Sequence, residues 1–88
     1  MELEQLRIFS AAADHGGFSQ AARRLYISHS TVSRAVSALE AELGVRLIER
    51  DSHRFTLTSA GSLLRAEADG LLRSAEDIMQ RVRAASKK

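Results

Sequence analysis

The sequence predicts a mainly α fold, a winged helix-turn-helix of three helices and a short β-hairpin, followed by one long helix. Three observations lead to this fold class: two short amphipathic segments joined by a tight turn within residues 18–43, two apolar segments around a polar turn directly after them, and a heptad pattern in the last third of the chain. Apolar residues that recur every three or four positions mark the buried face of a helix. The 88 residues suffice for one small domain, which we place at 1–58, followed by a linker helix at 59–88.

The first two helices are bounded by glycines and small polar residues. We expect the first helix over 2–15, where an apolar stripe is followed by Gly16 and Gly17, because glycine accepts the left-handed conformation at helix ends. The second helix is expected over 19–25, with Phe18 as an apolar staple and Ser19 as the N-cap.

The third helix is expected over 29–43, with Ser28 as its N-cap and Gly44 at its end. Its predicted buried side consists of Val32, Val36, Leu39 and Leu43, and its opposite side presents His29, Ser30, Ser33, Arg34 and Ser37. Serines are mediocre helix formers, so a row of them on an exposed face indicates a surface kept short to lie close against a partner. A DNA groove fits such a surface.

Residues 45–57 change character, with apolar segments on both sides of the polar residues 51–53, and they predict a short β-hairpin. A hairpin at this place is a wing, which we assign to residues 46–57. A last helix is then expected over 59–85, capped by Thr58 or Ser59. Its heptad seam is formed by Leu64, Ala68, Leu71, Ala75, Ile78 and Val82.

The last helix is too long for the domain that precedes it. At 1.5 Å per residue it would measure roughly 40 Å, more than three short helices can cover. We therefore predict a homodimer through this helix. The alternative is a monomer in which the helix folds back on its own domain.

Composition excludes several function classes. The chain has no cysteine, which excludes disulfides and a zinc finger, and its three histidines lie in separate elements without ligand partners, so no metal site and no cofactor are expected. No nucleophile, base and orienting group come together, so we expect no enzyme. No apolar run is long enough to span a bilayer, and we expect a cytoplasmic protein. The net charge is only +2, but residues 19–37 carry three arginines and no acid, which suits phosphate binding.

The segment AARRLYISHSTVSRAVSALEAELGVRLIER, followed by LTSAG, resembles the DNA-binding domain of the LysR-type transcriptional regulators. The resemblance extends from Leu3 to about Ile78. It implies a dimer that binds double-stranded operator DNA at an interrupted inverted repeat, with the third helix of each subunit in the major groove. It also implies that a small-molecule inducer binds to a larger C-terminal domain, so we expect this chain to be a DNA-binding fragment without the effector domain.

The chain departs from the family pattern at two places. His29-Ser30 stands where the family usually has Gln-Pro, which replaces a glutamine with an imidazole and adds a backbone N–H at a helix N-terminus, where anions are favoured. At the tip of the wing, an arginine often found in the family is His53, with Arg54 beside it. Base preference and minor-groove contact are therefore expected to differ from the family norm.

The predicted DNA-contacting residues have different roles. Arg34 is the first candidate for a guanine contact, with a phosphate contact or an internal salt bridge as alternatives. His29 and Thr31 are candidates for base edges, thymine methyls or phosphates, with helix capping as the alternative. Ser33 and Ser37 would contact phosphate, and Ser28 is foremost a cap. The wing would place cations at the minor groove, namely Arg50, His53 and Arg54, unless Arg50 pairs with Glu40 or Glu42.

Two competing functions remain open at this point. The long helix could make the chain a protein-interaction module that pairs with a longer relative as a decoy subunit. A non-specific nucleoid-type DNA binder is the other, but it would need a larger positive charge than +2.

Overall fold

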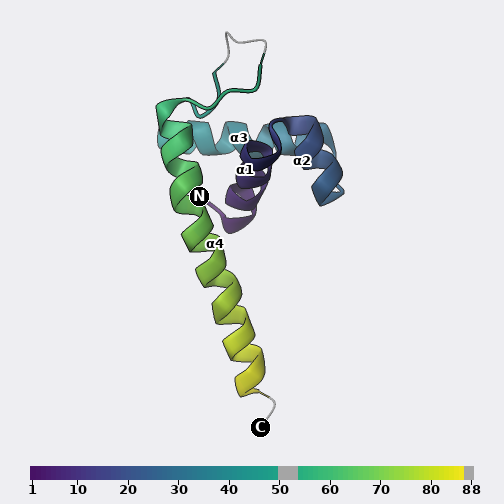
Figure 1. The fold of residues 1–88 in the computed structure, drawn as a ribbon, viewed down its shortest axis with the longest axis vertical. Coiled ribbons are helices and arrows are strands. Elements are labelled where there is room, and N and C mark those ends of the chain that lie inside the picture. Colours follow the sequence, from purple (N-terminus) through teal and green to yellow (C-terminus); the bar gives the residue numbers. More distant parts are fainter. Residues whose placement is uncertain (50–53, 87–88) are drawn as a thin grey trace.

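The computed structural model describes residues 1–49 and 54–86, and this part of the chain contains four helices (Figure 1). Three short helices, α1 (Leu3–His15), α2 (Phe18–Leu25) and α3 (His29–Leu43), pack against one another. The fourth, α4 (Ser59–Ala85), contacts α1 and then extends away from the other helices. The molecule is therefore elongated, with extents of 55 × 25 × 19 Å.

Local signals set most helix bounds as predicted. Gly16 and Gly44 end α1 and α3 in the left-handed conformation, with φ of 76° and 72°. The Ser28 hydroxyl caps α3 by accepting a hydrogen bond from the backbone N–H of Thr31, and Thr58 caps α4 by accepting one from Gly61.

The prediction of Ser19 as the N-cap of α2 is wrong. The helix begins one residue earlier, at Phe18, and Gly17 is the N-cap. The carbonyl of Gly17 already accepts the first helical hydrogen bond, from the N–H of Ala21 at 3.2 Å. After the left-handed turn at Gly16 the backbone is free to start the helix at once, so Ser19 lies inside its first turn.

The buried core consists of two clusters that meet at Phe18 and Phe55. One lies between α1, α2 and α3 and is rich in alanine, which permits the close approach of the helices: Ile8, Ala12, Ala21, Ala22, Val32 and Ala35. The other joins α1 and α3 to the segment before α4: Phe9, Val36, Leu39, Leu47 and Ile48. Val32, Val36 and Leu39 are fully buried, as predicted.

Leu43 does not belong to the buried face of α3, contrary to the prediction, because 44% of its surface is exposed. It is the last residue of α3, and it lies at a hollow of about 340 Å³ on the side of the molecule that faces α4. Val45, Leu63 and Leu64 line the same hollow. The helical pattern continues to Leu43, but the core that covers the pattern ends one turn earlier.

The predicted β-hairpin is represented in the described residues by one antiparallel bridge, between Ile48 and Leu57, and the two wing strands are not seen there. The bridge is flanked by hydrogen bonds from Glu49 N–H to the Thr56 carbonyl at 2.8 Å and from Thr58 N–H to the Leu47 carbonyl at 3.0 Å. The two described segments that flank the predicted tip are therefore paired at this one bridge. The predicted tip, 50–53, lies outside the described residues.

The start of α4 is fixed against the segment that precedes this bridge. The Thr58 hydroxyl donates to the Arg46 carbonyl at 2.6 Å. Gly61 packs so closely on the backbone of Leu47 that a Cβ at this position would lie 2.1 Å from the Leu47 carbonyl oxygen. None of the helices in the described ranges combines the length and apolar character that a membrane span requires.

Candidate nucleic-acid interface

The N-terminal end of α3 carries a cluster of hydroxyl groups. The Ser28 oxygen lies 2.8 Å from the Thr31 hydroxyl and 3.2 Å from the Ser30 hydroxyl, and it accepts the Thr31 N–H at 3.1 Å. Ser28 and Ser30 are exposed and Thr31 is half-buried. The first turn of α3 contains no acidic residue. Because a helix N-terminus carries partial positive charge and outward N–H groups, this end of α3 is suited to an anion such as phosphate.

Arg34 lies one turn after this cluster and is exposed. Its Nη2 atom lies 3.4 Å from the Thr31 hydroxyl oxygen, a long hydrogen bond that directs the guanidinium toward the N-terminal end of the helix. Ser37 is exposed one turn further, and Ser33 beside it is half-buried. The structure therefore brings Ser28, Ser30, Thr31 and Arg34 into one connected group, while Ser33 and Ser37 continue the same helix.

His29 is held by an aromatic contact that no pattern in the sequence predicts. Its ring meets the edge of Phe18, with 5.8 Å between ring centroids, and Phe18 meets Phe55 in the same way, also at 5.8 Å. The three rings connect the start of α2, the start of α3 and the segment before α4. Edge-to-face packing of this kind restrains ring orientation, so the placement of the exposed imidazole depends on Phe18.

Glu40 fastens the base of the predicted wing to α3. Its Oε2 atom accepts the backbone N–H of Leu47 at 2.8 Å and lies 3.4 Å from the N of Ile48. The sequence singled out Glu40 only as a partner for Arg50. A carboxylate that accepts hydrogen bonds from backbone N–H groups leaves no pattern in the sequence, because any residue type except proline can supply such a donor. Glu42, the other suggested partner, forms an ion pair with the N-terminal amine of Met1 at 2.6 Å.

The wing residues predicted to contact DNA are only partly described. Arg54 is exposed at the start of the second wing segment. Arg50 and His53 lie outside the described residues. In Figure 1 the described segments on either side of the predicted tip, 46–49 and 54–57, lie beyond α3, on the side away from the free end of α4.

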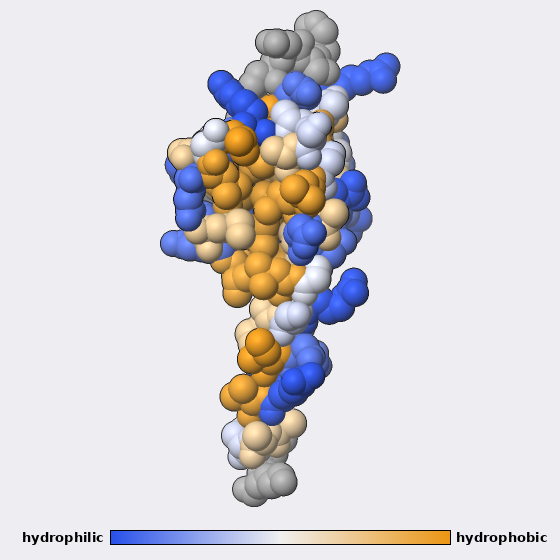
Figure 2. All heavy atoms as spheres, turned by 90° about the vertical axis from the view of Figure 1, so that its left-hand side faces the viewer, coloured by the Kyte–Doolittle hydropathy of each residue, from blue (hydrophilic) through white to orange (hydrophobic). Residues whose placement is uncertain are grey.

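A second exposed surface follows α4 and has the opposite character. Leu64 is half-buried and Ala68 is covered within the chain, with 1% of its surface exposed. Further along, Leu71, Ile78 and Val82 are exposed at 47%, 58% and 63%. Figure 2 shows this apolar surface continuing from the hollow around Leu43 down the length of α4. The predicted seam thus divides into a part covered by the chain itself and a part that is bare.

No group of three or more potential metal ligands occurs among the residues that the structure describes. The described site therefore consists of hydroxyls, an imidazole, a guanidinium and a helix N-terminus. These groups bind anions and base edges.

The chain is similar in sequence to a family of bacterial regulators and to individual transcriptional regulators. The sequence pattern of the bacterial regulatory helix-turn-helix proteins of the lysR family matches residues 3–62. The chain is 45% identical over 87 residues to the HTH-type transcriptional regulator TfdS of Cupriavidus pinatubonensis, covering 99% of this chain and 30% of that protein. It is 43% identical over 81 residues to the AhcY transcriptional activator HvrB of Rhodobacter capsulatus, covering 89% of this chain and 28% of that protein. The chain thus spans about a third or less of these relatives.

Solved structures agree with these sequence matches. The BenM DBD in complex with catB site 1 DNA superposes with a TM-score of 0.94 at 32% identity, covering 100% of this chain and 99% of that one. The CbnR DBD in complex with DNA gives a TM-score of 0.88 at 44% identity, covering 98% and 99%. Full-length CbnR superposes with a TM-score of 0.89 at 41% identity, covering 97% of this chain and 29% of that one.

Proposed function

Because the chain belongs to the LysR family of bacterial regulatory helix-turn-helix proteins, we propose that it binds operator DNA. In this proposal α3 is the recognition helix and residues 46–57 are the wing. The family consists of transcription regulators and not of enzymes. The observation that carries this proposal is the exposed N-terminal end of α3, where hydroxyls, helix dipole and the Arg34 guanidinium converge. Two similar DNA-binding domains, of BenM and CbnR, were crystallised with DNA. Their likeness to this chain supports the assignment.

The groups at this end of α3 have separate tasks in the proposal. Ser28 and Ser30 bind phosphate together with the helix N-terminus. Arg34 contacts a guanine through its forked guanidinium, which matches two acceptors of that base in the major groove. His29, held by Phe18, supplies a second contact to a base edge, where its imidazole either donates or accepts. Thr31, half-buried and bonded to Ser28 and Arg34, positions both.

The remaining predicted residues act along the same surface. Ser33 and Ser37 contact phosphates on the wall of the groove. The cations of the wing, Arg50, His53 and Arg54, lie along the minor groove, whose negative potential is greatest where it is narrow. A wing fastened to α3 through Glu40 and the Leu47 backbone would keep the two contact regions in a fixed relation.

The chain forms a homodimer through α4 in this proposal. Among the helices of the described chain only α1 lies close to the backbone of α4, while Ala60 and Leu64 at the start of α4 pack on the core cluster that contains Leu39. The exposed apolar residues Leu71, Ile78 and Val82 continue from the hollow at Leu43 and Leu63. Exposed apolar surface of this extent marks an interface. A two-fold dimer would present two α3 helices to the two halves of an inverted repeat. Ala75, half-buried on the same face, permits close approach of the helices.

The chain spans 30% of TfdS, so the rest of such a regulator has no counterpart in these 88 residues. We infer that these residues alone do not provide a response to a small-molecule inducer.

The experiment that tests the proposal is selection of bound duplexes from a randomised DNA pool, with the stoichiometry of the selected complex measured by light scattering. We expect an interrupted inverted repeat that holds two chains. Recovery of a half-site with one chain would contradict dimeric binding. Recovery of no consensus, together with stable association of the chain with a longer relative, would favour the protein-interaction module instead.

A further inference from the structure

A hollow of about 470 Å³ lies on the opposite side of the helix-turn-helix from α4, between the end of α1 and the exposed side of α2. Its lining contains two arginines, a histidine, a glutamine and a tyrosine, and no acidic residue: His15, Gln20, Arg23, Arg24 and Tyr26. None of these residues belongs to the surface assigned to DNA above.

Tyr26 is placed at the rim of this hollow in an unusual way. It ends α2 with φ 59° and ψ 43°, the left-handed conformation, and is the only residue other than glycine with positive φ in the described part of the chain. Residues other than glycine and asparagine rarely adopt this conformation. The Tyr26 side chain does not offset this unfavourable backbone conformation by packing in the core, because 94% of its surface is exposed. The turn itself requires the backbone conformation, but it does not require an exposed aromatic ring.

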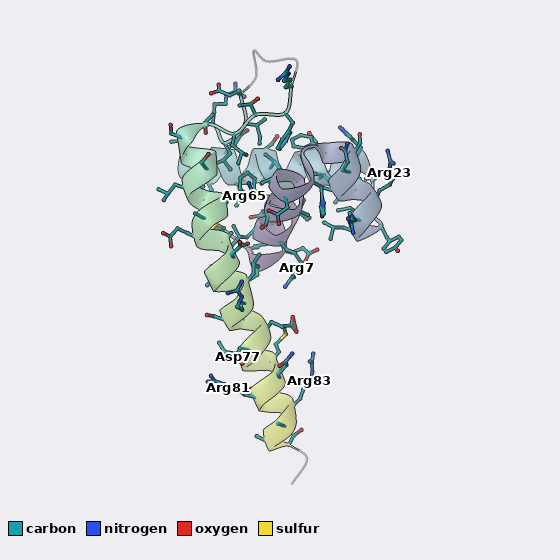
Figure 3. The ribbon with its side chains drawn as sticks, viewed as in Figure 1. Arg7, Arg23, Arg65, Asp77, Arg81 and Arg83 are labelled. Carbon is teal, nitrogen blue, oxygen red and sulfur yellow. The ribbon has the colours of Figure 1, made fainter. Side chains whose placement is uncertain are left out.

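Three arginines form ion pairs within the described residues, whereas the two arginines of the hollow, like Arg34, Arg73 and Arg83, do not. Arg65 pairs with Asp14 at 2.9 Å, Arg81 with Asp77 at 2.8 Å and Arg7 with Glu4 at 3.3 Å. Arg23 and Arg24, both exposed, have no ion pair within the described residues. Figure 3 shows Arg23 at the outer end of α2, distant from the labelled arginines of α4.

We propose that this hollow is a docking surface for an acidic segment of a second protein, with its carboxylates on Arg23 and Arg24 and an apolar side chain on the Tyr26 ring. Guanidinium groups match carboxylates in a two-pronged geometry, and tyrosine and arginine are among the residue types enriched at protein interfaces. The phosphates of a DNA backbone would pair with the arginines but would offer no apolar contact to the exposed Tyr26 ring. Because the hollow lies away from α4, a partner here leaves α4 free to pair.

The probe for this proposal is a fluorescein-labelled dodecapeptide of alternating glutamate and leucine, compared with the same peptide carrying glutamine for glutamate. Binding to the free chain is measured by anisotropy, and its location by backbone amide shifts in NMR spectra. We expect the acidic peptide to bind more tightly than the amide peptide and to shift the amides of 15–27. Equal binding of the two peptides, no binding, or shifts elsewhere would overturn the proposal.

Variants separate the contact from the fold. Replacement of both arginines, Arg23→Gln with Arg24→Gln, should weaken binding of the acidic peptide at least about fivefold. Tyr26→Asn, which suits the left-handed backbone, should weaken it at least about threefold without loss of thermal stability. The control, Arg73→Gln with Arg83→Gln, removes the same charge from α4 and should leave affinity unchanged. An equal loss of peptide affinity in the control would show that the peptide responds only to net charge, which would contradict the proposal.

A last experiment tests whether the hollow binds a protein partner or DNA. The acidic peptide should bind a chain already saturated with its selected duplex, and the Arg23→Gln, Arg24→Gln variant should keep its DNA affinity and salt dependence. Displacement of the peptide by DNA, with a shallower salt dependence in the variant, would show that both arginines contact phosphates and would overturn the proposal. The peptide experiments on the free chain are independent of the proposed operator binding, so failure of either idea is recognised separately.

Discussion

Helices α3 and α4 begin with the same kind of N-cap, but they differ in how much of their apolar face is covered by the rest of the chain. Each is capped by a hydroxyl that accepts the N–H three residues on, from Ser28 in α3 and from Thr58 in α4. The apolar face of α3 is covered at Val32, Val36 and Leu39, so the exposed face of this helix is its polar face. Beyond Ala68 the apolar face of α4 is at most half-covered, and Leu71, Ile78 and Val82 are exposed, so an apolar surface remains accessible. The same kind of amphipathic helix thus offers a polar partner one surface and an apolar partner another.

The largest loss of stability should come from a substitution on the buried face of α3. Leu39→Ala leaves a cavity in the core and should lower the free energy of unfolding by about 2–5 kcal/mol. Leu71→Ala, on the bare part of α4, is the matched control and should cost less than about 1 kcal/mol at a concentration where the chain is monomeric. Urea unfolding followed by circular dichroism measures both. Similar losses in the two variants would show that Leu71 is covered within the monomer.

The two glycines of α4 test where its coverage ends. Gly61→Ala would place a Cβ against the backbone carbonyl of Leu47 and should destabilise by about 1–3 kcal/mol. A Cβ at Gly70 meets no atom within 4 Å, so Gly70→Ala should stabilise by about 0.5–1 kcal/mol through helix propensity. Melting temperatures of the two variants report the difference. A neutral Gly61→Ala would mean that α4 is not held against the wing base.

Arg34→Ala tests the polar face of α3. It should lower affinity for the selected duplex by about 1–3 kcal/mol and reduce discrimination at one base pair, because a forked contact to guanine is lost. Ser33→Ala should mainly weaken binding on all sequences. Competition experiments with specific and random duplexes measure both effects, with unchanged unfolding as the check on folding. If Arg34→Ala weakens specific and random binding equally, Arg34 contacts only the backbone.

Ile78→Ala tests the bare face of α4. The loss of apolar contact should weaken the dimer by about 1 kcal/mol or more for each of its two protomers, so the dissociation constant measured by sedimentation should rise at least about tenfold. Arg73→Ala, on α4 but outside the predicted seam, is the control. An unchanged dissociation constant for Ile78→Ala would place the dimer contact elsewhere.

The last pair of variants concerns the N-caps of α3 and α4. Ser28→Ala and Thr58→Ala should each destabilise by about 0.5–2 kcal/mol. Thr58 should give the larger value, because its hydroxyl also donates to the Arg46 carbonyl, whereas the Ser28 hydroxyl has only hydroxyl neighbours and its capping bond. Thermal unfolding of both variants decides the order. The reverse order would indicate that the bond to Arg46 contributes little.

Sequence patterns located most of the candidate site but not its internal connections. The spacing of Ser28, Thr31 and Arg34 placed these residues near one end of a helix, and the structure joins them by hydrogen bonds. The contact of His29 with Phe18 was not predictable, since it depends on how α2 packs against α3. The same holds for Glu40, whose carboxylate is bound by backbone N–H groups of Leu47 and Ile48 from a later segment.

What the sequence determined by itself were the signals that act through near neighbours: the glycines that end α1 and α3, the hydroxyls that begin α3 and α4, and the turn between α2 and α3. Only the tertiary structure decided how far each apolar stripe is covered. Leu39 is buried and Leu43 is exposed, and Ala68 is buried while Leu71 is exposed, although both pairs continue one helical pattern. The physical reason is that a stripe depends on residue spacing within one helix, whereas its coverage depends on where the neighbouring helix ends.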